Sequence, residues 1–219
     1  MPTARETLLE AAHAAVRARP WTVVRMVDVA AAAGVSRQTL YNEFGSKEGL
    51  GAALVGRLVE DFLDGAARAV SEAGRDGADP AACCAAAAAW VLRTARAEPI
   101  VHAALTGCWG SRLPQPARPG PVPGPPRAVA RQAFPVEPGR LARLLRARAV
   151  HGLARAAPLP VGAPGTGAAG REAPDPRQLE RAFEAGLRVA LSYVVAPPGG
   201  PDDEPCGRVD AVVRALLTR

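Results

Sequence analysis

The sequence lacks the residue clusters on which metal and catalytic sites are usually built. It has four cysteines and three histidines among 219 residues, and the cysteines show no CxxC spacing. Because a structural zinc site needs four suitably spaced ligands, we expect no metal site. No phosphate-binding glycine loop or serine elbow is present, and His13, His102 and His151 are dispersed. We therefore predict that the protein is no enzyme and uses no cofactor.

Long apolar runs are also missing. No stretch approaches the length needed to cross a bilayer, and the N-terminus has no charged-then-apolar signal sequence. We therefore expect a cytoplasmic protein that makes no use of a membrane. Thiols stay reduced in that compartment, so we interpret the cysteines as packed thiols and keep a thiol-redox sensor as the alternative.

Lysine is almost absent, which limits what the net charge of +6 can indicate. Of the 27 basic residues only Lys47 is a lysine, a bias typical of arginine-rich codon usage. Residues 1–73 hold eight basic and nine acidic residues, so this part of the chain is nearly neutral. The overall basicity is therefore a weak indication of a polyanionic partner.

Hydrophobic residues recur at helical spacing along most of the chain, and no useful stretch alternates with a period of two. We therefore predict an all-α protein. Helices are expected over residues 5–18, 26–33, 36–45, 46–73, 81–97 and 138–156, and over two C-terminal stripes at 179–194 and 209–217 separated by a turn at 197–205. The segments 110–126 and 158–176 are so rich in proline and glycine that we expect long loops or disordered inserts there.

Residues 26–44 have the pattern of a helix-turn-helix. Ala30 is small enough to stand where two helices cross, and Gly34 tolerates the left-handed backbone of the turn. Apolar residues that wedge the helices together are expected at Val29, Val35 and Leu40. The spacing alone also fits a turn that merely joins two helices of a bundle.

The second helix of this motif would enter the major groove of double-stranded DNA. Ser36 is expected to cap it and to leave backbone N–H groups facing a phosphate. Tyr41 and Lys47 are placed to bind phosphates, which fixes the register of the complex. Arginine takes two acceptors on guanine, glutamine pairs with adenine, and the threonine methyl meets the thymine methyl. The candidates for such base contacts are Arg37, Gln38, Thr39 and Asn42.

The same stretch resembles the signature of the tetracycline-repressor (TetR) family of transcriptional regulators, IAxxAGVSxxxLYxHFxSKExL. Residues 29–50 have Val-Ala, Ala-Gly-Val-Ser, Leu-Tyr, Phe and Ser-Lys-Glu-Gly-Leu in the same register. The resemblance covers about the first 60 residues and implies that Gln38, Thr39, Tyr41 and Lys47 meet DNA. It implies a repressor that a small ligand releases from its operator. An activator with the same DNA contacts, or a small-molecule or thiol sensor with a vestigial DNA-binding head, are the alternatives.

Two departures from the family pattern are visible. Val24 and Arg25 stand where the family often has Thr or Ser, whose hydroxyl caps the helix that follows and touches phosphate. Arg25 is expected to replace the phosphate contact but not the cap. Glu43 stands where His or Tyr is usual, and because a carboxylate there repels phosphate, we expect it to pair with a nearby arginine.

A single recognition helix covers only a few base pairs, so specific binding requires a homodimer on a palindromic operator, with the two helices roughly 34–36 Å apart. The two C-terminal stripes predict an antiparallel helical hairpin, our candidate for a four-helix dimer interface. Its residues are Leu179, Phe183, Leu187, Leu191, Val195, Val212 and Leu216. The alternative is that both stripes close the core of the monomer.

The chain between the helix-turn-helix and the hairpin holds the candidate pocket for a small-molecule effector. A mostly apolar pocket with a few polar groups suits an apolar or aromatic ligand. The candidates are its few large or polar-tipped side chains: Phe62, Trp90, His102, Trp109, Phe134 and Tyr193. For each residue taken singly, ordinary core packing is the more common explanation. We thus expect a DNA-binding domain over residues 1–46 and a ligand-binding and dimerisation domain over 47–219.

Overall fold

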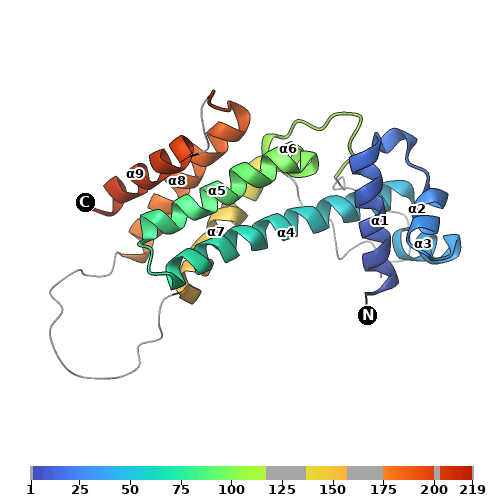
Figure 1. Cartoon of the computed structure of the whole chain (residues 1–219), viewed down its shortest axis with the longest axis horizontal. Helices are drawn as coiled ribbons and strands as arrows, with labels where there is room; N and C mark the ends of the chain where they lie inside the picture. The colour runs from blue at the N-terminus through green and yellow to red at the C-terminus, as the bar shows by residue number, and fades with distance from the viewer. Residues whose placement is uncertain (1, 117–136, 157–174, 200–202, 219) are drawn as a thin grey trace, which may run out of the picture. The chain divides into compact units, whose positions relative to one another are not determined.

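The computed structural model describes residues 2–116, 137–156, 175–199 and 203–218. In these ranges every regular element is a helix (Figure 1), which confirms the all-α prediction. The elements are α1 (Ala4–Ala18), η1 (Trp21–Val23), α2 (Met26–Ala32), α3 (Arg37–Phe44), α4 (Lys47–Arg75), α5 (Pro80–Ala97), α6 (Pro99–Thr106), α7 (Pro138–Ala156), α8 (Pro176–Val195) and α9 (Asp203–Leu217). None of the helices in these ranges is both long and apolar enough to cross a membrane.

The chain divides into two compact units. The first is formed by residues 1–61 and 98–140, and the second by residues 62–97 and 141–219. Helix α4 contributes its first half to one unit and its second half to the other. These units are structural, and the functional division at residue 46 stays a prediction.

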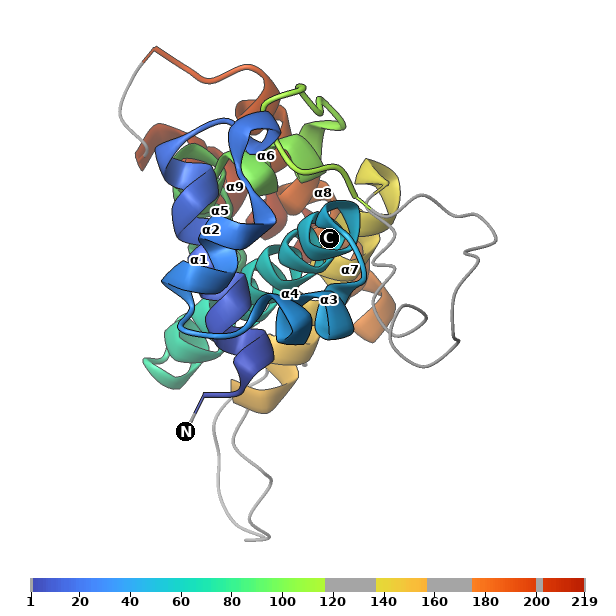
Figure 2. The same ribbon diagram turned by 90° about the vertical axis from the view of Figure 1, so that its right-hand side faces the viewer.

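Helices α1, α2 and α3 pack against one another in the first unit and face the viewer in Figure 2. The apolar stripe of α1 buries Leu8, Leu9 and Ala12. A capping box fixes the first turn of α1, because the Thr3 hydroxyl accepts a hydrogen bond from the Glu6 N–H while the Glu6 carboxylate accepts one from the Thr3 N–H at 2.7 Å. These bonds, the backbone one foremost, lower the pKa of Glu6.

The first unit also contains α6, a helix that the sequence analysis did not predict. Its signals are nevertheless present, since Pro99 stands at the first position and Gly107 ends the helix with a φ of +75°. Glu98 caps α6 and is only 8% exposed. Its carboxylate lies 2.7 Å from Nε2 of His13 in α1. This contact joins the start of α6 to α1 within the first unit.

Helices α5, α8 and α9 pack against one another in the second unit (Figure 1). The predicted C-terminal hairpin is confirmed, but the turn is shorter than expected because α9 begins at Asp203. Pro205 is accommodated in its first turn, where the missing N–H costs nothing. Gly186 permits the close approach of these helices, since a Cβ there would lie 2.5 Å from Val213 and 2.9 Å from the Cys84 sulfur.

Asp79 joins the start of α5 to α9. Its carboxylate accepts hydrogen bonds from the Ala82 N–H at 3.0 Å and from the Arg214 guanidinium at 3.3 Å. The bond from Arg214 is the main cause that holds the pKa of Asp79 below its ordinary value. Because this pKa is depressed in the folded state, the ionised Asp79 carboxylate stabilises the fold fully above the ordinary pKa of Asp. That stabilisation is lost as the pH falls through the depressed pKa.

We expect Asp79→Asn to lower the urea midpoint of unfolding at neutral pH and to have little effect in acid. Asparagine keeps an oxygen that can cap α5 but removes the charge that pairs with Arg214. Urea unfolding followed by circular dichroism across a pH series measures both regimes. A deficit of the same size at every pH would contradict a role for the charge.

Candidate nucleic-acid interface

The helix-turn-helix forms as predicted, between α2 and α3. Ala30 is 2% exposed at the helix crossing, and Leu40 of α3 is fully buried. Gly34 has a φ of +69°, the left-handed conformation that the turn requires. The Val35 N–H donates to the Ala30 carbonyl at 3.0 Å and closes the turn. Of the three residues predicted to wedge the helices together, Val29 is buried like Leu40, whereas Val35 is only half-buried.

Ser36 caps the recognition helix α3, as expected. Its hydroxyl accepts a hydrogen bond from the Thr39 N–H at 3.0 Å and lies 2.9 Å from the Thr39 hydroxyl. The backbone of Ser36 is extended, and the helix begins at the next residue. The other backbone N–H groups of the first turn have no acceptor within the helix and point out of its N-terminal end. This is a favourable place for a phosphate.

Exposed polar side chains line the outer surface of α3. Arg37, Gln38 and Asn42 are all exposed, and Thr39 is half-buried beside the cap. The Gln38 amide donates to the Asn42 side-chain oxygen at 2.9 Å, so the two amides hold each other one turn apart. Tyr41 leaves 48% of its surface exposed. These side chains are accessible from outside the helix, and their contacts with DNA stay predictions.

Lys47 lies in the first turn of α4 and is held by η1. Its ammonium group donates to the Thr22 carbonyl at 3.1 Å and lies 5.3 Å from the centre of the Trp21 ring. The Ser46 hydroxyl caps α4 by accepting from the Gly49 N–H at 3.1 Å, which confirms the predicted cap. A cationic side chain next to α3, positioned by a tryptophan and a carbonyl, suits a phosphate contact.

The two departures from the family pattern have the local consequences expected of them, a missing cap and a paired Glu43, while the phosphate contact of Arg25 stays a prediction. Arg25 precedes α2 and is exposed, but its side chain makes no capping hydrogen bond. Glu43 pairs with an arginine, Arg5 of α1, at 3.5 Å. The sequence did not indicate which arginine this would be, because 38 residues separate the two side chains and only the packing of α1 on α3 joins them.

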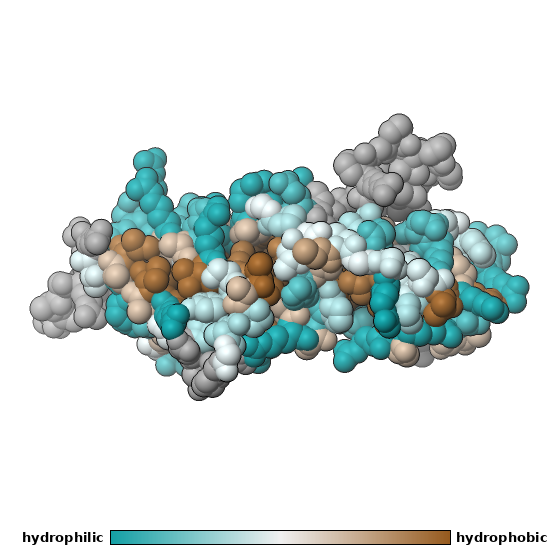
Figure 3. All heavy atoms as spheres, turned by 90° about the horizontal axis from the view of Figure 1, so that it is seen from above, coloured by the Kyte–Doolittle hydropathy of each residue, from teal (hydrophilic) through white to brown (hydrophobic). Residues whose placement is uncertain are grey.

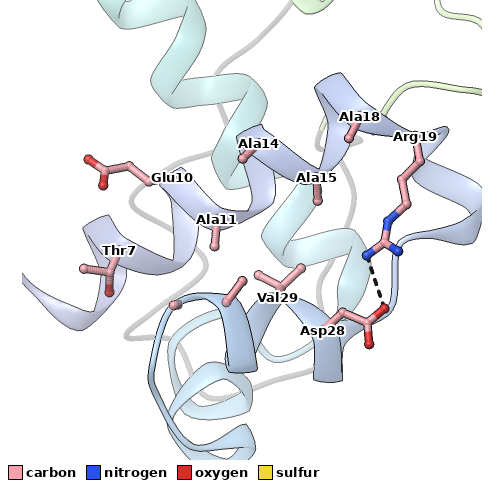
Figure 4. Close-up of a pocket in the computed structure, with 11 residues that line it drawn as sticks. Thr7, Glu10, Ala11, Ala14, Ala15, Ala18, Arg19, Asp28 and Val29 are labelled. Carbon is pink, nitrogen blue, oxygen red and sulfur yellow. Dashed lines mark hydrogen bonds and ion pairs between the residues drawn. The ribbon is translucent and has the colours of Figure 1, made fainter.

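A groove of about 640 Å³ runs between α1 and α2 (Figure 4). Most of its lining is alanine, and Arg19 donates to Asp28 at 3.2 Å across one part of it. The side chains predicted to meet DNA do not line this groove.

The predicted effector-site residues are divided between the two units. In the second unit Phe62 is 1% exposed, and the Trp90 indole donates to its carbonyl at 2.9 Å. The Trp90 ring lies over Gly65, where a Cβ would come within 2.1 Å of it. The Tyr193 hydroxyl accepts a hydrogen bond from the Arg208 guanidinium at 3.1 Å.

The remaining candidates for the effector site lie elsewhere. His102 is exposed and Trp109 is half-buried, and both belong to the first unit, while Phe134 lies outside the described residues. Their role in ligand binding stays a prediction.

The predicted dimer residues differ in exposure. Phe183 and Leu187 are buried in the unit's own core, at 0% and 2%. Val195 is 71% exposed and Leu216 is 36% exposed. Three more are half-buried, namely Leu179, Leu191 and Val212. Hydrophobic residues gather at the left of Figure 3, on the side where Figure 1 places α8 and α9. If a partner binds this face, it meets the outer residues, while Phe183 and Leu187 support them from inside.

Comparison with known proteins agrees with this geometry. The family model described as "Bacterial regulatory proteins, tetR family" matches residues 8–54, which run from α1 into α4. The HTH-type transcriptional regulator AlkX of Mycobacterium tuberculosis is 43% identical over 60 residues, which cover 27% of this chain and 28% of that protein.

A solved structure resembles the fold over nearly the whole chain. It is that of the TetR family repressor AlkX from Dietzia sp. strain DQ12-45-1b, with a TM-score of 0.55 and 22% identity over 98% of this chain and 95% of that one. At this identity the likeness concerns the fold alone. Residues 8–54, which hold the N-terminal helix-turn-helix, therefore match the TetR family of bacterial regulatory proteins.

Proposed function

We propose that the protein is a sequence-specific, DNA-binding transcriptional regulator that works as a repressor in the cytoplasm. One observation carries the proposal: α3 is a capped helix of a TetR-family domain whose outer surface presents Arg37, Gln38 and Asn42 to solvent. Arginine, glutamine and asparagine are the side chains that read guanine and adenine in the major groove. Lys47 and the free N–H groups of α3 supply the phosphate contacts that fix its position.

The proposal includes a homodimer and a small, largely apolar effector. Two copies are needed because each recognition helix reads only a few base pairs of a palindromic site. The apolar and aromatic side chains among the candidate pocket residues, such as Phe62 and Trp90, favour an apolar or aromatic ligand. By linkage, a ligand that favours a dimer with mismatched recognition helices weakens DNA binding by about 5–150-fold.

Selection of DNA from a random pool tests the function. The purified full-length protein is incubated with random double-stranded DNA, bound molecules are amplified, and the enriched duplex is compared with a scrambled one by fluorescence anisotropy across a salt series. We expect a palindromic duplex to be enriched and preferred. If no sequence is enriched at any salt concentration, the head is vestigial and the sensor alternative is favoured.

Gln38→Ala and Lys47→Ala are expected to affect binding differently. Gln38→Ala removes a base contact and should relax the base preference at one position of the selected duplex, with a loss of about 1–3 kcal/mol in discrimination there. Lys47→Ala removes a phosphate contact and should weaken binding to all duplexes alike. It should also lower by about one the slope of the logarithm of the binding constant against the logarithm of the salt concentration. Anisotropy with single-base variants of the duplex separates the two results. Unchanged selectivity in Gln38→Ala would count against the assignment of α3 as the recognition helix.

Cys83 and Cys84 are buried, which favours a regulator without a thiol switch at these two residues, whereas Cys108 is exposed and is not the packed thiol that the sequence analysis expected. Burial raises the pKa of the Cys84 thiol to about 12, and it also raises the pKa of Cys83. Because the thiolate is the reactive form, both should resist alkylation in the folded protein. We expect iodoacetamide to modify the exposed Cys108 first, as read by peptide mass spectrometry. Rapid modification of Cys84 in the native protein would instead revive the thiol-sensor alternative.

A further inference from the structure

The recognition helix carries a carboxylate near its C-terminal end. Glu43 is the last residue but one of α3, and its side chain is 38% exposed. A negative charge at this end of a helix is unfavourable, because it meets the negative end of the helix dipole. It also repels the phosphates that the same helix must approach. Some other group must therefore offset Glu43 if α3 is to dock on DNA.

Arg5 makes three contacts with this end of α3. Its guanidinium lies 3.5 Å from the Glu43 carboxylate and donates to the Glu43 carbonyl at 3.4 Å. Its central carbon lies 4.6 Å from the centre of the Phe44 ring, a residue buried in the head. The last carbonyls of a helix lack partners within the helix, so this donation also satisfies the helix end.

Arg5 is held in place from its own side. It belongs to the first turn of α1, which the Thr3–Glu6 capping box fixes, and the following turn buries Leu8 and Leu9 in the core. A planar guanidinium can meet a carboxylate, a carbonyl and a ring face together, whereas a lysine ammonium acts as a point charge. The Arg5 side chain is 27% exposed, so water screens these contacts only in part.

We propose that Arg5 is a positioning residue for the recognition helix: it clamps the C-terminal end of α3 and neutralises Glu43, so that DNA affinity depends on the pair and not on either residue alone. The inference rests on the proposed DNA-binding function. It differs from a direct phosphate contact by Arg5, because an arginine that binds phosphate is needed whether or not Glu43 carries a charge.

The test compares full-length variants on the duplex that the wild-type protein selects. We expect Arg5→Gln to weaken binding about fivefold, because it leaves the Glu43 charge uncompensated near phosphate. Adding Glu43→Gln should restore affinity to within about twofold of wild type, since the repelling charge is then gone. Arg5→Lys should fall between wild type and Arg5→Gln, because it keeps the charge but loses the planar contacts.

Two matched controls distinguish an effect of the Arg5–Glu43 pair on DNA binding from an effect of the net charge of the protein. Arg17→Gln removes an exposed arginine from the same helix, and we expect it to weaken binding less than Arg5→Gln. Adding Glu10→Gln to Arg5→Gln restores the net charge through another exposed acidic residue of α1, and it should not rescue binding. Thermal unfolding of every variant, followed by circular dichroism, shows that the head is folded when its affinity is measured.

The outcomes are distinct. Rescue by Glu43→Gln but not by Glu10→Gln supports the positioning role. Equal binding by wild type and Arg5→Gln overturns it, as does a loss in Arg5→Gln that Glu43→Gln leaves uncorrected, which would make Arg5 a phosphate ligand. If the wild-type protein selects no duplex at all, the proposed function itself has failed, before any variant is compared.

Discussion

Leu40→Ala should lower the free energy of unfolding of the head, the domain formed by α1, α2 and α3, by about 2–5 kcal/mol. This loss is far larger than that expected for any substitution of an exposed residue on α3. Leu40 has no exposed surface and stands in the wedge between α2 and α3, with Val29 at 1% exposure nearby in the same core. The head is small, so neighbouring helices cannot collapse into the cavity without moving the recognition helix. DNA binding should therefore be lost together with stability.

Urea unfolding followed by circular dichroism measures the loss, and Gln38→Ala is the matched control. Gln38 is exposed on the same helix, so its substitution should change stability by no more than about 0.5 kcal/mol. Similar midpoints for the two variants would mean that Leu40 does not lie in the wedge. A separate early transition in Leu40→Ala would show that the head unfolds on its own.

The head could be predicted in detail because its signals are local. Gly34, Ser36 and Gly45 mark the turn, the start and the end of α3, and each acts on residues within one helical turn. The requirement for a left-handed glycine or a capping hydroxyl is visible in the sequence without knowledge of the fold. The helix ends there agree with the structure to within a residue or two.

Contacts between distant segments could not be predicted in the same way. Arg5 meets Glu43, and His13 meets Glu98, only because helices far apart in the sequence pack together. Nothing in the pattern around His13 distinguishes a residue that bonds a buried carboxylate from an ordinary half-buried histidine. Helix α6 was missed although its signals are local, since Pro99 is the first residue of the helix and Gly107 ends it.

The C-terminal stripes show a further limit of periodicity. The spacing of Phe183, Leu187 and Val195 predicts one apolar face, but it does not tell the inside of a unit from a surface that a partner could cover. The structure separates them, since Phe183 is fully buried and Val195 is 71% exposed. Only the exposed members of a stripe can bind a second copy directly.

The double substitution Val195→Asp/Leu216→Asp is expected to dissociate the proposed dimer and to weaken binding to the selected duplex about 100-fold or more, because a monomer gains nothing from the second half-site. The chain itself should stay folded, since both side chains are at least 36% exposed. In a two-fold interface each change occurs twice, so four carboxylates would enter one apolar contact.

Sedimentation equilibrium gives the mass of the assembly, and anisotropy gives the affinity for the duplex. Ala154→Asp, which adds the same charge at an exposed position of α7, is the control and should leave both unchanged. A dimer that survives the double substitution would place the interface away from Val195 and Leu216. A monomer that still binds the palindrome as tightly as the wild type would show that the two recognition helices act independently, which would remove the physical reason for dimerisation in this protein.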